Sequence, residues 1–202
     1  MDVIMAALLL VLLSPIMALI ALAIRLDSPG PAVFRQERVG QFGRTFIMLK
    51  FRSMHVNADE RVHRQFAKQY INGFTPEGSS VEGRTVFKPN GDKRVTRVGK
   101  WLRRTSLDEL PQLINVLRGE MSLVGPRPAV RYEVEEYSPW HMQRLTVPPG
   151  LTGLAQISGR SGLTFDKIVR LDIEYIQRRS LALDIAILFK TIPVVLNAKC
   201  AA

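Results

Sequence analysis

The chain has 202 residues, which is long for one domain and short for two. It holds 28 lysines and arginines against 18 aspartates and glutamates, which gives a formal net charge of +10. An ordinary soluble enzyme needs no such excess of positive charge. The excess fits an anionic partner such as a phosphorylated substrate, a nucleic acid or lipid headgroups. The single cysteine, Cys200, excludes an intrachain disulfide.

The first predicted element is an apolar segment, residues 3–24, which carries no charged side chain. A helix of about 22 residues suffices to cross a hydrocarbon core of ~30 Å. Ser14 and Pro15 interrupt the segment near its middle. Proline removes a backbone hydrogen bond, and the serine beside it can take up the freed carbonyl group. The residues alone favour a kinked spanning helix over a re-entrant segment that enters and leaves on one face.

Two strands are expected next, residues 32–40 and 44–54, on either side of a turn at residues 40–43. Alternation places Lys50 and Arg52 on the same face of the second strand. A solvated strand edge explains these two charges equally well.

Residues 57–73 predict a helix that begins with Asn57 as its cap and ends at Gly73. Its apolar stripe contains Val62, Phe66 and Tyr70. Residues 74–92 are polar and rich in turn formers, and we expect a surface loop that could act as a lid.

A carboxylate pair, Asp108 and Glu109, follows a basic stretch at residues 93–104. Apolar residues then recur at helical spacing up to Gly119, and we place the start of this helix at Asp108 because Pro111 then costs no hydrogen bond. The N–H groups and partial positive charge of a helix start keep carboxylates ionised and attract phosphate. One carboxylate there could attack phosphorus, and its neighbour could hold Mg²⁺ on a diphosphate. Helix capping within a solvated basic face is the alternative interpretation.

Two segments further along the chain also favour phosphate binding. Pro126 and Pro128 flank Arg127 and restrict its backbone, which would make the guanidinium a preorganised fork for phosphate, although a structural turn is the alternative. Residues 147–162 form a glycine-rich loop that ends near Arg160, and its glycines allow close backbone approach to a ligand.

The last two predicted elements are helices. Residues 165–179 have Thr164 as a cap, and Asp172 falls close to the apolar stripe, where an acid needs a partner such as a structural ion pair. Residues 181–197 are strongly apolar but contain Asp184, Lys190 and Pro193, which predicts an interfacial or core helix.

Several of these segments together resemble a known family. They are LLSP, SPGPAVFRQERVG, FIMLKFRSM, SLDELPQLINVLRGEMSLVGPRP, PPGLTGLAQISGR and LDIEYI, in this order over nearly the whole chain. They resemble the bacterial sugar transferase family, the monotopic phosphoglycosyl transferases that start glycoconjugate assembly on polyprenyl phosphate. The run from Ser106 to Pro128 is the most specific part of the match. The chain is close in length to the minimal catalytic unit of this family. The additional N-terminal membrane helices of its larger members are either lacking or removed, and the start of the native chain stays open.

The resemblance implies both a fold and an activity. The fold would be α+β, mainly helical with a small β-hairpin, with a re-entrant membrane helix over residues 1–26, interfacial amphipathic helices and a cytoplasmic catalytic domain over residues 27–202. The re-entrant interpretation replaces the spanning one that the residues alone favour. The activity would be transfer of a phosphosugar from a nucleotide diphosphate sugar, usually a UDP-sugar, to undecaprenyl phosphate. UMP would leave, at the cytoplasmic face of the bacterial inner membrane, as glycoconjugate or exopolysaccharide synthesis begins.

The resemblance also assigns roles to residues. Asp108 matches the nucleophile that forms a covalent acyl-phosphate sugar intermediate, and Glu109 matches the residue that holds Mg²⁺. The membrane break maps to Ser14 and Pro15. The resulting candidate substrate-binding residues are Lys50, Arg52, Arg103, Pro126, Arg127, Pro128, Arg160 and Asp172.

The main rival hypothesis is a membrane-tethered basic module that binds anionic lipid or nucleic acid. It would explain the charge of the chain but not the carboxylate pair, and Trp101 is the only aromatic residue in the basic stretch. A further alternative is an integral transferase that works without a covalent intermediate. We therefore expect a UDP-sugar, polyprenyl phosphate and membrane lipids as partners, and no nucleic acid. The identity of the sugar and the oligomeric state stay open, and a homodimer is compatible with the sequence.

Overall fold

The computed structural model describes residues 1–56, 61–73, 80–81, 84–85, 94–159 and 162–196. The α-helices are α1 (Asp2–Asp27), α2 (Arg61–Ile71), α3 (Arg97–Thr105), α4 (Gln112–Leu117), α5 (Arg131–Val134), α6 (Leu154–Ser158), α7 (Phe165–Arg178) and α8 (Leu181–Leu196). The 3₁₀ turns are η1 (Gln41–Gly43), η2 (Leu107–Glu109) and η3 (His141–Leu145). The strands are β1 (Val33–Val39), β2 (Thr45–Phe51), β3 (Ser80–Val81), β4 (Arg84–Thr85), β5 (Ser122–Val124) and β6 (Gly150–Thr152). The expected mainly helical α+β class with a small β-hairpin is confirmed.

Helix α1 continues through Ser14 and Pro15, and it is long and apolar enough to cross a membrane. Pro15 cannot donate to the carbonyl of Val11, four residues earlier. The Oγ of Ser14 donates to that carbonyl at 2.8 Å instead. The expectation that the serine takes up the freed carbonyl is therefore confirmed.

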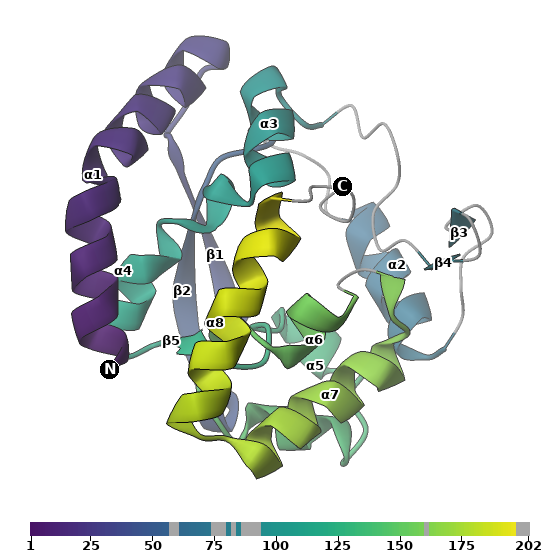
Figure 1. Cartoon of the computed structure of the whole chain (residues 1–202). Helices are drawn as coiled ribbons and strands as arrows, with labels where there is room; N and C mark the ends of the chain where they lie inside the picture. The colour runs from purple at the N-terminus through teal and green to yellow at the C-terminus, as the bar shows by residue number, and fades with distance from the viewer. Residues whose placement is uncertain (57–60, 74–79, 82–83, 86–93, 160–161, 197–202) are drawn as a thin grey trace.

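The same helix lies along one side of the molecule (Figure 1). Ala6 near its start is buried in the main core, and Ile20 and Ile24 near its end are buried against α3. It also contacts α4 and β5. Both ends of α1 are thus anchored to the rest of the protein.

Strands β1 and β2 form the predicted antiparallel hairpin, with a register that runs from Val33 opposite Phe51 to Val39 opposite Thr45. In this register Lys50 lies opposite Phe34, and Arg38 lies opposite Phe46. Because side chains alternate along a strand, Arg38 and Lys50 project from the same face of the hairpin. Arg52 follows the last residue of β2.

Strands β5 and β6 form a parallel pair that the sequence did not predict, with Ser122 opposite Gly150 and Val124 opposite Thr152. The two backbones approach closely, and a Cβ atom on Gly150 would overlap the backbone nitrogen of Gly125. A Cβ on Gly153 would likewise overlap the carbonyl oxygen of Gly125. Gly150 and Gly153 thus allow two backbone segments to pack, and the close approach of this loop to a ligand stays a prediction.

The main core lies where α1, α4, α7, α8 and the strands meet, and its fully buried side chains include Met48, Leu113, Val116, Tyr175 and Ile187. A smaller core joins α2 to α7 through Tyr70, Ile71, Phe165 and Val169. The predicted helix over residues 165–179 is confirmed, and its cap Thr164 accepts from the N–H of Lys167 at 3.4 Å. The predicted cap Asn57 and most of the predicted loop at residues 74–92 lie outside the described residues.

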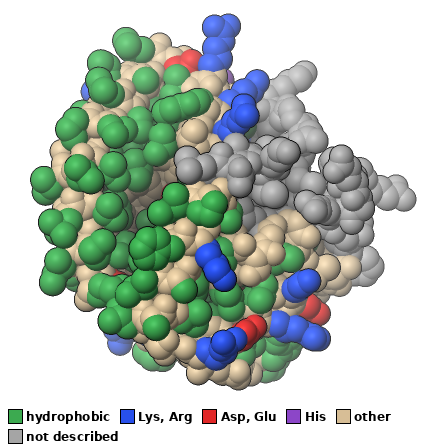
Figure 2. Space-filling model, in the orientation of Figure 1, with side chains coloured by type: hydrophobic (Ala, Val, Ile, Leu, Met, Phe, Trp, Pro, Cys, Tyr) green, Lys and Arg blue, Asp and Glu red, His purple; other side chains and the backbone are tan. Residues whose placement is uncertain are grey.

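Exposed apolar side chains gather over α1 and α8 (Figure 2). They recur at helical spacing, so each helix presents one apolar side outward. We call this surface the apolar face; it consists of Ile4, Leu8, Val11, Leu12, Ile16, Leu19, Leu22 and Leu26 on α1 and Leu181, Ile185, Phe189 and Ile192 on α8. A contiguous apolar surface of this kind marks a membrane or protein contact.

Candidate active site

The predicted carboxylate pair lies on the short turn η2 between α3 and α4. Helix α3 ends at Ser106, which adopts the left-handed conformation with φ 56° and ψ 16°. Helix α4 begins only at Gln112, with Pro111 as its N-cap. The predicted helix start at Asp108 is therefore wrong: the chain reverses at Ser106 and makes a 3₁₀ turn first. A left-handed conformation costs a non-glycine residue ~1 kcal/mol, and such strain is often found at functional sites.

A lysine of the hairpin brings a positive charge to the pair. Lys50 Nζ lies 2.9 Å from Glu109 Oε1, and their side chains are 20% and 37% exposed. Asp108 is half-buried on the same turn. The structure thus brings together the predicted residues Lys50 and Glu109 and places Asp108 beside them.

A residue that the sequence did not single out, Asn115, sets the position of this turn. Its side chain is fully buried and bonds to β2 as a neighbouring strand would: Oδ1 accepts from the N–H of Leu49 at 3.0 Å, and Nδ2 donates to the carbonyl of Ile47 at 2.7 Å. Nδ2 also lies 2.7 Å from Glu120 Oε2. Asn115 therefore fixes α4, and η2 before it, against the strand that carries Lys50.

The predicted proline-flanked arginine lies on a segment, residues 126–129, whose backbone carbonyl groups accept hydrogen bonds from other parts of the protein. We call these residues the Arg127 segment. Pro126 and Pro128 are buried, whereas Arg127 between them is exposed. The carbonyl of Pro126 accepts from the N–H of Gly150 at 2.8 Å, and that of Ala129 accepts from the N–H of Val39 at 2.9 Å. The guanidinium of Arg127 is thus carried on a fixed backbone.

Asp172, which the resemblance places in the site, forms a buried ion pair. Its Oδ2 lies 2.7 Å from Arg144 Nη2, and the two side chains are only 2% and 5% exposed. Arg144 also donates to the hydroxyl of Tyr137 at 2.9 Å and contacts the carbonyl of Arg127 at 3.5 Å. Burial would lower the pKa of Arg144, but the charges of Tyr137 and Asp172 outweigh it and raise that pKa. The sequence analysis offered a structural ion pair as one interpretation of Asp172, and this is such a pair. Through Arg144 it also contacts the backbone of the Arg127 segment.

The remaining predicted residues lie elsewhere. Arg52 is buried and donates to the carbonyls of Pro29 and Ser28, at 2.7 and 2.6 Å, beside the end of α1. These contacts give it a structural role, and its role in substrate binding stays a prediction. Arg103 is half-buried in the last turn of α3, next to η2. Arg160 lies outside the described residues.

The predicted Mg²⁺ ion is compatible with the groups present. Magnesium in phosphoryl-transfer sites commonly uses one or two carboxylates and completes its shell with substrate phosphates and water. Asp108 and Glu109 are two such carboxylates, although Lys50 engages Oε1 of Glu109. Among the described residues no group of three or more His, Cys, Asp or Glu side chains could hold a metal by itself. Substrate phosphates and water would complete the shell of a metal held by these carboxylates.

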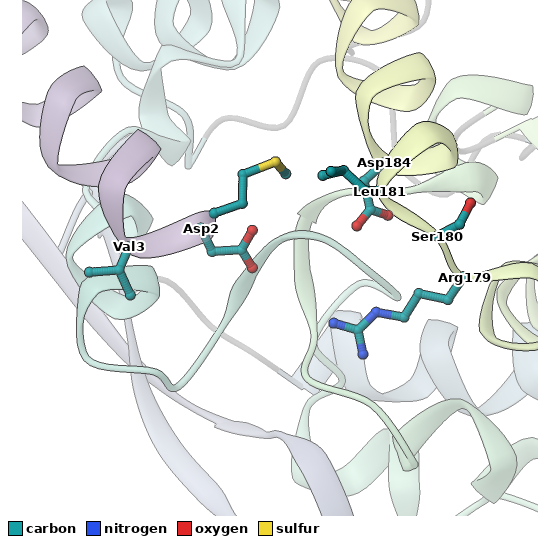
Figure 3. Close-up of a pocket in the computed structure, with 7 residues that line it drawn as sticks. Asp2, Val3, Arg179, Ser180, Leu181 and Asp184 are labelled. Atoms are coloured by element: carbon teal, nitrogen blue, oxygen red, sulfur yellow. The ribbon is translucent and has the colours of Figure 1, made fainter.

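A separate cavity of about 500 Å³ lies where the starts of α1 and α8 meet (Figure 3). Asp2, Arg179, Ser180 and Asp184 are the polar residues that line it. Asp2 accepts from the hydroxyl of Ser122 at 2.6 Å, and Asp184 accepts from the hydroxyl of Tyr175 at 2.7 Å. None of the predicted site residues lines this cavity, so it is distinct from the turn that carries Asp108.

Comparison with known proteins identifies the family of the chain. The profile of the family described as bacterial sugar transferase matches residues 1–198. A UDP-glucose:undecaprenyl-phosphate glucose-1-phosphate transferase of Caulobacter vibrioides is 45% identical over 205 residues, covering 98% of this chain and 68% of that protein. The exopolysaccharide production protein ExoY of Sinorhizobium fredii is 45% identical over 194 residues, covering 96% of this chain and 83% of that protein. The galactosyl transferase CpsE of Streptococcus agalactiae is 46% identical over 168 residues, covering 83% of this chain and 35% of that protein.

The chain belongs to the bacterial sugar transferase family. It spans about two fifths or less of the length of several of the curated relatives that it matches.

Proposed function

We propose that the chain transfers a sugar phosphate from a UDP-sugar to undecaprenyl phosphate and so begins the synthesis of an exopolysaccharide or a related glycoconjugate. The observation that carries the proposal is the Lys50–Glu109 ion pair, which fixes the turn of Asp108 beside the hairpin that also anchors the Arg127 segment. The names of two relatives, in Caulobacter vibrioides and Escherichia coli, specify UDP-glucose as donor and undecaprenyl phosphate as acceptor.

In the first step an oxygen of the Asp108 carboxylate attacks the phosphorus atom that bears the sugar. A bond forms from Asp108 to phosphorus, the bond from phosphorus to UMP breaks, and its electron pair leaves with UMP. Glu109 orients the donor, Lys50 fixes Glu109, and Arg127 offers a planar fork to the phosphate oxygens. A Mg²⁺ ion held by Glu109 would neutralise charge on the diphosphate and so reduce its repulsion of the Asp108 carboxylate.

In the second step a phosphate oxygen of undecaprenyl phosphate attacks the same phosphorus atom. The bond to Asp108 breaks, and the carboxylate is regenerated. Two diphosphate bonds of similar energy are exchanged, so the acyl phosphate keeps the bond energy between the two steps. Positioning and electrostatic stabilisation must then supply most of the rate.

The lipid acceptor requires a site at a membrane surface, and we propose that the apolar face lies in the cytoplasmic leaflet of the bacterial inner membrane. Helix α1 is anchored to the body at both ends, so a spanning path would carry the polar surface of the body into hydrocarbon. A path that enters and leaves on one face, as expected of a re-entrant segment, avoids this cost. Exposed Trp101 and Lys100 on α3 suit the headgroup region beside it.

The test is UMP release from detergent-solubilised protein supplied with a panel of UDP-sugars, Mg²⁺ and polyprenyl phosphate. The substitution Asp108→Asn removes the nucleophile, and we expect UMP release to fall by at least about 10³-fold. Asp166→Asn, at an aspartate that is 62% exposed on α7, is the matched control and should leave the rate unchanged.

Intact-mass measurement after mixing with donor alone separates the two transferase mechanisms. We expect one phosphosugar adduct on the wild-type chain and none on the Asp108→Asn variant. Comparable UMP release from that variant would rule out the nucleophile, and release without an adduct would favour direct transfer between the two substrates. The rival binding module predicts no UMP release at all, and the family membership does not favour it.

A further inference from the structure

One buried arginine near the proposed site has no assigned role. Arg38 on β1 is only 6% exposed. Its Nη1 donates to the carbonyl of Pro128 at 3.1 Å, and its Nη2 donates to Oε1 of Gln36 at 2.6 Å. Its Nε has no hydrogen-bond partner within the described part of the chain. Arg38 therefore supplies one of the contacts that hold the Arg127 segment.

The β1–β2 hairpin connects the contact between Arg38 and Pro128 to the Asp108–Glu109 pair. Arg38 and Lys50 project from one face of the hairpin, because Phe34 is the partner of Lys50 and lies four residues before Arg38. Four residues of strand span about 13 Å. Lys50 holds Glu109 at one end of this distance, and Arg38 holds Pro128 at the other. The hairpin face thus sets the spacing between the acids and Arg127.

Within the described part of the chain, the charge of Arg38 has no ion-pair partner. None of the ion pairs among the described residues includes Arg38, although buried arginines are normally paired. Burial and the nearby charge of Arg127 lower the pKa of Arg38 to about 10, and the carboxylates of Glu133 and Glu109 only partly oppose this. Arg38 stays protonated at neutral pH, so two guanidinium charges lie near each other. An anion bound at Arg127 would relieve their repulsion.

We propose that Arg38 is a positioning residue for the diphosphate of the donor: it fixes the Arg127 segment relative to Glu109, and its uncompensated charge strengthens anion binding at Arg127. This inference deepens the proposed function and rests on it for the identity of the donor. A purely structural Arg38 would contribute to stability but not to the affinity of the site for anions.

The test measures the thermal unfolding of the detergent-solubilised chain against the concentration of inorganic pyrophosphate, which gives an apparent Kd. Arg38→Gln keeps a donor for the carbonyl of Pro128 but removes the charge. Arg35→Gln removes the same charge from an exposed position on the other face of β1 and serves as the control. We expect the apparent Kd of Arg38→Gln to rise about tenfold with a weaker salt dependence, and that of Arg35→Gln to stay at the wild-type value. Arg38→Lys, which keeps the charge, should retain most of the affinity.

Equal apparent Kd values for Arg38→Gln and Arg35→Gln would overturn the inference, as would a wild-type chain that pyrophosphate does not stabilise. If Arg38→Lys lost as much affinity for pyrophosphate as Arg38→Gln, the charge of Arg38 would not explain the effect. The UMP assay keeps the two proposals apart. If pyrophosphate binding depends on Arg38 but the wild-type chain releases no UMP from any UDP-sugar, the anion site stands and the proposed activity fails.

Discussion

At the scale of single residues, the ion pair between Asp172 and Arg144 shows how a charge can belong to a site without touching a ligand. Both side chains are buried, and Arg144 connects the pair to Tyr137 and to the backbone of Arg127. Removing one charge leaves the other buried without compensation, which typically costs about 3–5 kcal/mol.

We therefore expect Asp172→Asn to lower the free energy of unfolding by about 3 kcal/mol or more. The double variant Asp172→Leu, Arg144→Met should recover most of this loss, because two apolar side chains leave no buried charge. Denaturant unfolding of both variants in detergent is the measurement. Losses of similar size in the single and double variants would instead show that the pair itself stabilises the protein.

The sequence predicted Lys50 and the Asp108–Glu109 pair because they fall in distinctive patterns. Arg38 and Asn115 had no such signal. Arg38 stands in an alternating strand among other charged residues, and nothing local shows that its face is covered by the Pro126–Pro128 segment, 90 residues away. In the sequence, Asn115 is one polar residue in an apolar helix. Its role depends on hydrogen bonds to the backbone of β2. Such residues become visible only when distant segments are placed together.

At the scale of elements, the hairpin and α7 were predicted with nearly correct bounds, because the alternation, turn residues and cap are all local. The start of α4 was not, because the left-handed Ser106 and the turn η2 are set by packing against α3 and β2. The pairing of β5 with β6 was also missed. These two short strands are joined through residues 125–149, and each is too short to show a pattern by itself.

The close contact between these strands yields a prediction for Gly150. We expect Gly150→Ala to destabilise the protein by about 3 kcal/mol or more, since a Cβ would overlap the backbone of Gly125 and neither backbone can move alone. Gly43→Ala is the control: Gly43 has φ 78° in an exposed turn with nothing within 4 Å of the added Cβ, so only backbone strain of about 1 kcal/mol is expected. Thermal unfolding of both variants checks the difference, and equal shifts would contradict the packing argument.

At the scale of the whole molecule, composition predicted a membrane segment, but the path of that segment depends on its packing. An apolar helix of 26 residues is long enough to span a bilayer. What argues against a spanning path is tertiary: Ala6 packs with the main core, Ile24 packs against α3, and the apolar sides of α1 and α8 lie on one surface (Figure 2). A one-leaflet path requires both ends of α1 to meet the aqueous phase on the side that holds the body.

This requirement can be tested with single cysteines in a chain whose native Cys200 is replaced by serine. Val3 is 55% exposed near the start of α1, Arg25 is exposed near its end, and Gln177 on α7 is an exposed reference position on the body. In inside-out membrane vesicles, where the cytoplasmic surface faces the medium, we expect a membrane-impermeant maleimide to label Val3→Cys, Arg25→Cys and Gln177→Cys alike. In right-side-out vesicles none of the three should react until the membrane is opened. Labelling of Val3→Cys only from the side opposite to Gln177→Cys would show that α1 spans the bilayer. The packing of α1 along the body would then have to break on insertion.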